Sequence, residues 1–102
     1  MIRLTRRALL AAAAALLPSA AIAATHEVSI TAEGFQPPRV EAEPGDTVIF
    51  TNAHDRAHTA TADDGTFDTG RIQPGESQSV TVLGPTGYVD RFNPRFVGAI
   101  GG

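Results

Sequence analysis

The chain has 102 residues, with eight arginines, no lysine, eleven acidic residues and no cysteine, and its formal net charge at pH 7 is −3. Because it has no cysteine, it can form no disulfide, no thiolate bond to a metal and no lipid attachment through sulfur. The acidic balance disfavours nucleic acid and anionic lipid as partners, since both bind basic surfaces.

The first 23 residues have the composition of an export signal. Arg3, Arg6 and Arg7 precede a run rich in alanine and leucine, and the small-x-small sequence Ala-Ile-Ala ends at Ala23. The apolar run of about ten residues is too short for a stable membrane anchor, which needs about 20. We expect residues 1–23 to be a cleaved signal peptide and the product to be periplasmic or secreted. The paired arginines favour the twin-arginine route, with the general secretory route as the alternative.

Residues 24–102 form one short domain once the signal is removed. This part keeps five of the eight arginines and all eleven carboxylates, so its net charge is −6. A chain of this size buries only about 60% of its unfolded surface, and its core supplies only a small free energy of unfolding. We therefore expect an acidic domain of marginal stability unless a metal ion or a protein partner stabilises it.

Apolar and polar residues alternate in short runs between Gly and Pro turns, which is typical of a half-buried antiparallel sheet. Pro-Gly pairs predict tight turns at residues 44–45 and 74–75, and no segment of about ten residues outside the signal has helical periodicity. About six to eight short strands predict an all-β Greek-key sandwich. In chain order, the clearest expected strands cover residues 27–31, 39–43, 47–52, 59–62, 77–83 and 97–100.

The segment from Gly87 to Gly98 resembles the last loop of a known family. In small blue-copper proteins of the plastocyanin, amicyanin and pseudoazurin kind, this loop reads Tyr-x-Cys-x-x-His-Pro-x-Met-x-Gly, and Tyr88, Pro94 and Gly98 match it. The resemblance to small bacterial cupredoxins covers almost all of residues 24–102 and implies a cupredoxin β-sandwich. Further matches, in the correct order, are Phe35-x-Pro-Pro, Pro44-Gly45-Asp46, Thr51-Asn52, His58-Thr59, Phe67-Asp68 and Pro74-Gly75.

The resemblance places four residues at the copper-ligand positions of the family. His58 stands at the first ligand position, and Asp90, Asn93 and Phe96 stand where the family has Cys, His and Met. A blue-copper site needs thiolate sulfur to stabilise Cu(I). Copper held by His58, Asp90 and Asn93 would therefore be weakly bound Cu(II), outside the blue type.

The family's use of one ion to bind both positions implies that His58 and Asp90 lie close together. We expect a hydrogen bond or ion pair between them in place of the metal, with Arg91 or Arg95 as a competing cation. Phe96 stands at the family's axial ligand position but has no ligand atom. The alternative role for its ring is to plug the vacated copper pocket.

Two further histidines lie outside the ligand positions of the family. We expect His54 to be a surface residue, with an accessory Cu(II) ligand as the alternative. His26 would be the third residue of the processed chain if cleavage follows Ala23. An amino-terminal x-x-His sequence can chelate Cu(II) or Ni(II), so this site depends on the cleavage point.

Arg91, Phe92 and Arg95 lie where members of the resembled family present a patch for docking redox partners. Arginine and aromatic residues are enriched in protein interfaces, so these three residues are candidates for contact with a periplasmic protein. No catalytic arrangement is recognisable in the sequence, and we expect no enzyme.

Three functions remain open. The first is a metal-free interaction or structural domain. The second is a periplasmic copper-binding or carrier protein with a weak Cu(II) site at His58 and Asp90. The third is copper electron transfer, the usual role of the resembled family, which the missing cysteine disfavours.

Overall fold

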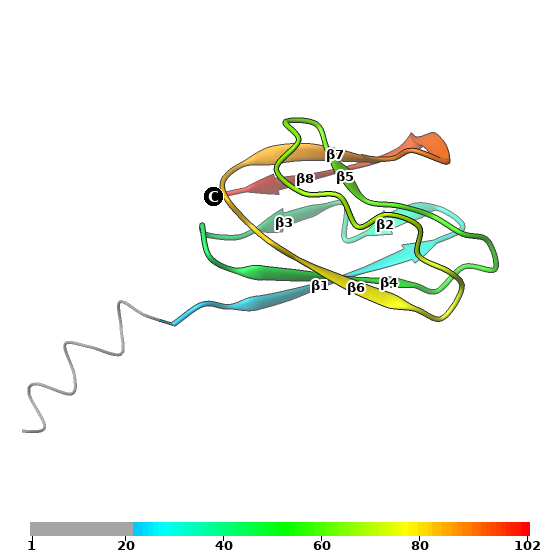
Figure 1. Cartoon of the computed structure of the whole chain (residues 1–102), viewed down its shortest axis with the longest axis horizontal. Helices are drawn as coiled ribbons and strands as arrows, with labels where there is room; N and C mark the ends of the chain where they lie inside the picture. The colour runs from blue at the N-terminus through cyan, green and yellow to red at the C-terminus, as the bar shows by residue number, and fades with distance from the viewer. Residues whose placement is uncertain (1–21) are drawn as a thin grey trace, which may run out of the picture.

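The structure, a computed structural model, describes residues 22–102 (Figure 1). Within that range the chain forms eight strands and no helix, and thus no helix there that could cross a membrane. The predicted all-β sandwich is confirmed, whereas the predicted signal peptide falls almost wholly on residues outside the described range. The strands are β1 (Thr25–Thr31), β2 (Gly34–Gln36), β3 (Arg39–Glu41), β4 (Thr47–Asn52), β5 (Thr61–Ala62), β6 (Ser77–Thr81), β7 (Thr86–Asp90) and β8 (Asn93–Gly101).

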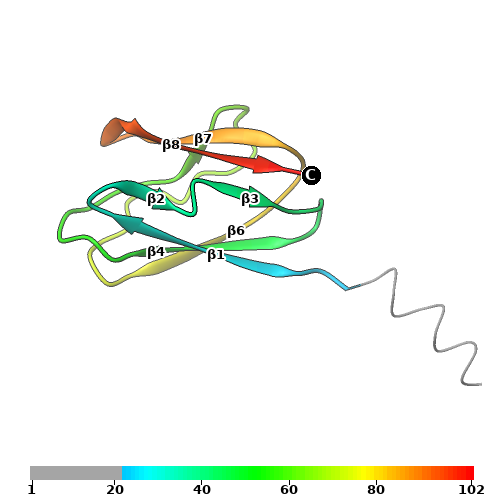
Figure 2. The same ribbon diagram turned by 180° about the vertical axis from the view of Figure 1, so that it is seen from behind.

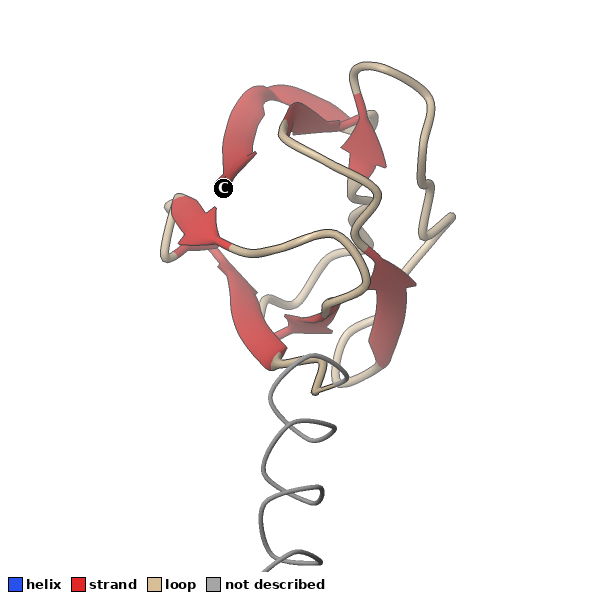
Figure 3. Cartoon of the chain, turned by 90° about the vertical axis from the view of Figure 1, so that its left-hand side faces the viewer, coloured by secondary structure: helices blue, strands red, loops and turns tan. Residues whose placement is uncertain are grey.

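The strands form two sheets of four, which face each other across the core (Figures 2 and 3). One sheet has the order β2-β1-β4-β6 and the other has the order β3-β8-β7-β5. The sequence pattern predicted antiparallel pairing, but β1 with β4 and β3 with β8 are parallel. The chain between the members of each parallel pair crosses to the other sheet, and the alternation of apolar residues carries no signal of strand direction.

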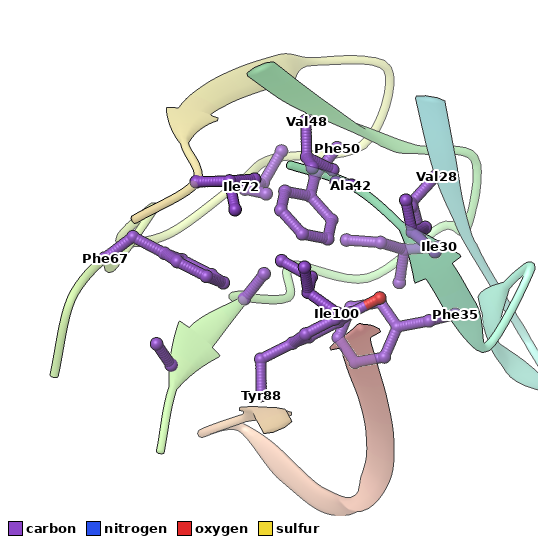
Figure 4. Packing of buried hydrophobic residues seen from close by; sticks show 14 residues of the cluster. Val28, Ile30, Phe35, Ala42, Val48, Phe50, Phe67, Ile72, Tyr88 and Ile100 are labelled. Carbon is purple, nitrogen blue, oxygen red and sulfur yellow. The ribbon is translucent and has the colours of Figure 1, made fainter. Parts of the chain in front are cut away.

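The core lies between the sheets, where alternate residues of the strands point inward (Figure 4). In β4, Val48 and Phe50 are buried and their neighbours are partly exposed, as the two-residue period of a strand requires. Tyr88 of β7 packs against three phenylalanines, with its ring centroid 4.8 Å from Phe35, 5.3 Å from Phe50 and 6.1 Å from Phe67. These edge-on and tilted contacts form the aromatic centre of the core.

Two expected strands have different bounds in the structure. The strand predicted at residues 59–62 is only β5, because Ala60 bonds instead to Thr69 through both its N–H and its carbonyl. The final strand is longer than predicted, since β8 begins at Asn93 rather than at residue 97. The segment that resembles a ligand loop is consequently a hairpin with Asp90 paired to Asn93, and its turn lies at the end of the molecule away from the C-terminus (Figure 1).

Tyr88 and Gly98 depend on each other across this hairpin. They are opposite each other in the register of β7 and β8, and a Cβ atom at Gly98 would overlap the Tyr88 ring. Tyr88 is 1% exposed, its hydroxyl has no hydrogen-bond partner among the described residues, and burial raises its pKa to about 12. Glycine opposite the tyrosine therefore follows from the close approach of the ring to the neighbouring strand.

Replacing Gly98 by alanine tests this packing. We expect Gly98→Ala to lower the free energy of unfolding by about 1–3 kcal/mol, the usual cost of an overpacked core. The measurement is urea unfolding followed by circular dichroism. Gly84→Ala is the control, because a Cβ atom there meets nothing within 4 Å. Equal stability of the two variants would contradict the proposed steric role of Gly98.

Candidate functional site

The candidate site forms where the end of β7 meets the segment that carries His58. His58 is held by two backbone hydrogen bonds with Ile72, at 3.1 and 2.7 Å. Asp90 is the last residue of β7, and its side chain is completely buried. His58 Nδ1 donates a hydrogen bond to Asp90 Oδ2, with the His58 side chain only 4% exposed. The contact expected between these two residues is confirmed.

The second carboxylate oxygen of Asp90, Oδ1, accepts hydrogen bonds from the backbone of two different segments. Oδ1 accepts hydrogen bonds from the N–H groups of Thr59, at 3.0 Å, and Phe92, at 2.9 Å. The N–H of Arg91 donates to the Thr59 hydroxyl at 2.9 Å, so the turn is fixed to the His58 segment. The guanidinium of Arg91 pairs with Asp68 at 2.9 Å, away from His58 and Asp90. Arg91 is therefore not the competing cation that was considered from the sequence.

The structure adds His54 to the site, in contact with His58. His54 Nδ1 lies 2.8 Å from Nε2 of His58, the ring nitrogen that does not face Asp90. The two ring planes are within 18° of each other, and His54 Nε2 lies 3.3 Å from Asp55 Oδ1. A chain of polar contacts thus runs from buried Asp90 through both imidazoles to exposed Asp55.

Asn52 explains why His54 faces His58. Its buried side chain donates to the carbonyls of Arg56, at 2.6 Å, and Ile72, at 2.9 Å, and it accepts from the N–H of His54 at 2.9 Å. This places the loop after β4 over His58. The spacing of His54 and His58 gives no such signal in the sequence, because a four-residue separation implies a shared face only in a helix.

Phe96 lies on the other side of His58. Its ring centroid is 5.5 Å from that of His58, with the planes at 27°, and it packs partly buried against the hydrophobic core. Phe96 also approaches Gly34, where a Cβ atom would be 3.5 Å from its ring. This position agrees with the alternative that the phenyl ring fills space beside His58.

An open hollow of about 490 Å³ brings most of the predicted site residues together. Asp90 does not line it, since it lies behind His58, and neither does Arg91. Within residues 22–102, Arg56 and Arg95 have no carboxylate within ion-pair distance. The lining residues are Ala32, His54, Arg56, His58, Phe92, Asn93, Arg95 and Phe96.

No protein-family model matches the sequence, and no curated protein is significantly similar to it. Solved structures do match. A novel purple cupredoxin from Nitrosopumilus maritimus has a TM-score of 0.67 and 21% identity over 74% of this chain and 97% of its own. Amicyanin from Paracoccus versutus has a TM-score of 0.67 and 18% identity over 74% of this chain and 78% of its own.

The chain has the cupredoxin fold. A Cu-containing nitrite reductase from Thermus scotoductus SA-01 is also similar, with a TM-score of 0.67 and 24% identity over 74% of this chain, but the match covers only 21% of that longer chain. At these identities the likeness establishes the cupredoxin architecture alone.

The residues of this cupredoxin-fold chain do not fit a blue-copper centre. The chain has no cysteine, and such a centre requires a thiolate ligand. Two atoms bonded to one ion at about 2.0–2.2 Å in tetrahedral geometry are more than about 3 Å apart, whereas His58 Nδ1 and Asp90 Oδ2 are in direct contact. In residues 22–102 no group of three or more His, Cys, Asp or Glu side chains is arranged to hold a metal ion. Cu(II) binding by His58, Asp90 and Asn93 stays a prediction.

The buried pair can be tested by removing the carboxylate. We expect Asp90→Ala to lower the free energy of unfolding by about 3–5 kcal/mol, because it leaves the buried donors of His58 and Thr59 and the partly buried N–H of Phe92 without an acceptor. Asp90→Asn, which keeps one acceptor oxygen, should lose less. The measurement is denaturant unfolding.

The control for this experiment is Glu41→Gln. Its ion pair with Arg39 is exposed on both sides, with side-chain exposures of 61% and 66%, so we expect a change below about 1 kcal/mol. A loss at Asp90→Ala no larger than that of the control would contradict the structural role of Asp90.

Proposed function

We propose that this protein is a metal-free cupredoxin-fold domain, exported to the cell envelope, that works by binding another protein. The observation that carries the proposal is the direct hydrogen bond from His58 to Asp90. These residues stand at two copper-ligand positions of the resembled family. A protein-internal bond between them gives this end of the sandwich a fixed geometry that needs no metal ion.

The distribution of charge supports a protein partner. Four of the five arginines in residues 24–102 gather around the β7–β8 turn, although that part of the chain has a net charge of −6. Arg56 and Arg95 line the hollow, and the Arg71 guanidinium lies 5.2 Å from the centre of the Phe92 ring, a cation–π contact. We call Arg56, Arg71, Arg91, Phe92 and Arg95 the arginine-rich end.

The arginine-rich end has the chemistry of an interface for an acidic partner. Phe92 is 51% exposed within this group, and aromatic residues and arginine are both enriched in protein interfaces. Opposite charge on the partner would speed association and suppress binding of cationic proteins. We therefore extend the predicted interface of Arg91, Phe92 and Arg95 to two more arginines. These are Arg56, which lines the hollow, and Arg71, which contacts Phe92.

A photo-crosslinking amino acid in place of Phe92 tests this function in the source organism. We expect one acidic protein to be crosslinked from position 92 and not from position 83, where Leu83 is 63% exposed in the β6–β7 connection. With that partner purified, Arg95→Glu should weaken binding about tenfold or more, because it reverses a charge at the contact.

Arg39→Glu is the matched control, since Arg39 pairs with Ala99, six residues along β8 from Asn93 and so about 20 Å away. Crosslinking that is equal at positions 92 and 83, or equal weakening by Arg39→Glu and Arg95→Glu, would contradict docking at the arginine-rich end.

Copper handling is the second candidate function. It is favoured by the two imidazoles that line the same hollow, although His54 Nδ1 and His58 Nε2, 2.8 Å apart, would have to separate to hold one ion. Imidazole suits Cu(II), and a carboxylate bonded to the other nitrogen of a ligating histidine is a common arrangement. Arg56 and Arg95 beside the same hollow oppose a cation, which makes this the second candidate. Electron transfer of the blue-copper kind is disfavoured by the missing thiolate.

Titration of residues 24–102 with Cu(II), followed by calorimetry and electron paramagnetic resonance, separates the two candidates. We expect no one-to-one binding tighter than about 1 μM and no intense blue colour, because the hollow offers two imidazoles flanked by arginines. His54→Ala and His26→Ala are titrated alongside to identify any histidine involved. Tight binding that is lost in His54→Ala would favour copper handling over the metal-free function.

A further inference from the structure

Asp46 forms a second buried polar cluster, far from the arginine-rich end. It lies in the turn before β4 and is 6% exposed. Its Oδ1 accepts a hydrogen bond from the backbone nitrogen of Ala24 at 2.9 Å. Its Oδ2 accepts from the N–H of Glu43 and lies against His26 Nε2, both at 2.9 Å. The Asp46 carboxylate thus gathers the start of β1 and the turn into one site.

We propose that the peptide bond between Ala23 and Ala24 is the processing site, and that the α-ammonium group of Ala24 released there becomes the ion-pair partner of Asp46. Hydrolysis of this bond by an envelope peptidase consumes one water molecule. It leaves a carboxylate on Ala23 and an amine on Ala24, which takes up a proton near neutral pH.

The change at the Ala24 nitrogen is from a neutral amide to a charged group. An α-amino group has an ordinary pKa of about 7.7–8.0 and is mostly protonated at pH 7. A hydrogen bond between an ammonium and a carboxylate is shorter and stronger than one from a neutral amide. The precursor therefore holds Asp46 by a neutral hydrogen bond where the processed protein has an ion pair.

Asp46 is suited to receive a positive charge. The bond with the His26 imidazole, followed by the N–H groups of Glu43 and Ala24, lowers the pKa of its carboxyl to about 2. The carboxylate is consequently ionised from a few pH units above that value up to the pH at which the α-amino group loses its proton. Ala24 is also held through its carbonyl, which accepts from the N–H of Thr47 at 2.9 Å.

The position of the proposed cleaved peptide bond follows from the first residue that is hydrogen-bonded to the folded domain. Ile22 is 78% exposed and Ala23 is exposed, whereas Ala24 has hydrogen bonds at both its nitrogen and its carbonyl. Cleavage one residue later would remove both contacts. Cleavage one residue earlier would leave an alanine between the charge and Asp46. Only a chain that starts at Ala24 places the ammonium against the carboxylate.

The same contacts bear on copper chelation by the processed terminus. Chelation by an amino-terminal x-x-His sequence uses the amine and the imidazole together, and here both bond to Asp46. Cu(II) would have to displace Asp46 from both groups and Thr25 from its place beside Thr47 in the sheet. The ion pair with Asp46 therefore competes with the chelate that was considered from the sequence.

The test compares two forms that contain every strand of the fold, residues 24–102, whose α-amine is on Ala24, and residues 23–102, whose α-amine is one alanine further from Asp46. We expect the form that starts at Ala24 to melt about 4–8 °C higher, a shift typical of one added stabilising contact in a domain of this size. In Asp46→Asn the difference between the two forms should vanish. A similar melting temperature of both forms with Asp46 intact, or a difference that persists in Asp46→Asn, would overturn the proposal.

Two further measurements keep the proposal testable should Asp46→Asn fail to fold. Mass spectrometry of the protein exported in the source organism should give a mature terminus at Ala24, and another terminus would overturn the assignment. Titration of the α-amino group by NMR should give a pKa above its ordinary value, because the carboxylate stabilises the charged form. A pKa at or below that value would overturn the ion pair.

Discussion

The carboxylate of Asp90 holds two distant segments of the chain, residues 58–59 and residues 90–92, at one point with no contact to solvent. Through its two oxygens it joins the end of β7, the His58–Thr59 segment and the turn at Phe92. A buried carboxylate is costly unless each lone pair that faces protein is satisfied. Here the donors are the His58 side chain, the backbone of Thr59 and the backbone of Phe92 in the turn, so the position of each depends on the other two. His58 and Phe92, which Asp90 fixes in place, in turn line the hollow beside the arginine-rich end.

The fold was predictable because its signals are local. Alternation of buried and exposed residues in β1 and β4, with turns at Pro44 and Pro74, indicated the strands without any long-range information. The contact of His58 with Asp90 was predictable for a different reason, since the resembled family implies that residues at these two positions meet. Both predictions used information that lies in the sequence itself or in the spacing of its motifs.

The rest depends on contacts between distant residues. His54 faces His58 because the Asn52 side chain bonds to the carbonyl of Ile72, 20 positions away, and nothing in the residues around His54 encodes this. Ala60 is not part of the expected strand because its N–H donates to the Thr69 hydroxyl and its carbonyl accepts from the Thr69 N–H. The final strand begins at Asn93 because that residue pairs directly with Asp90 across the hairpin. These features are determined by tertiary contacts, which override the local propensity of the residues involved.

The same sandwich can therefore persist while the chemistry at its end changes. In a small metal-binding domain, the free energy of binding the metal contributes to the free energy of folding. The bonds of Asp90, with Phe96 packed beside His58, are contacts of the protein itself and form as the chain folds. A fold shared with copper proteins is thus no measure of shared activity, and function has to be argued from the residues at the site.

Tyr88 gives this protein a single intrinsic fluorophore. It is the sole tyrosine, and the chain has no tryptophan, so the ultraviolet fluorescence arises almost entirely from one ring. That ring lies at the centre of the core beside Phe35 and Phe50 (Figure 4). It also packs against Gly98 of the neighbouring strand. Its emission is an internal reporter of whether the two sheets are packed together, and no label has to be attached to read it.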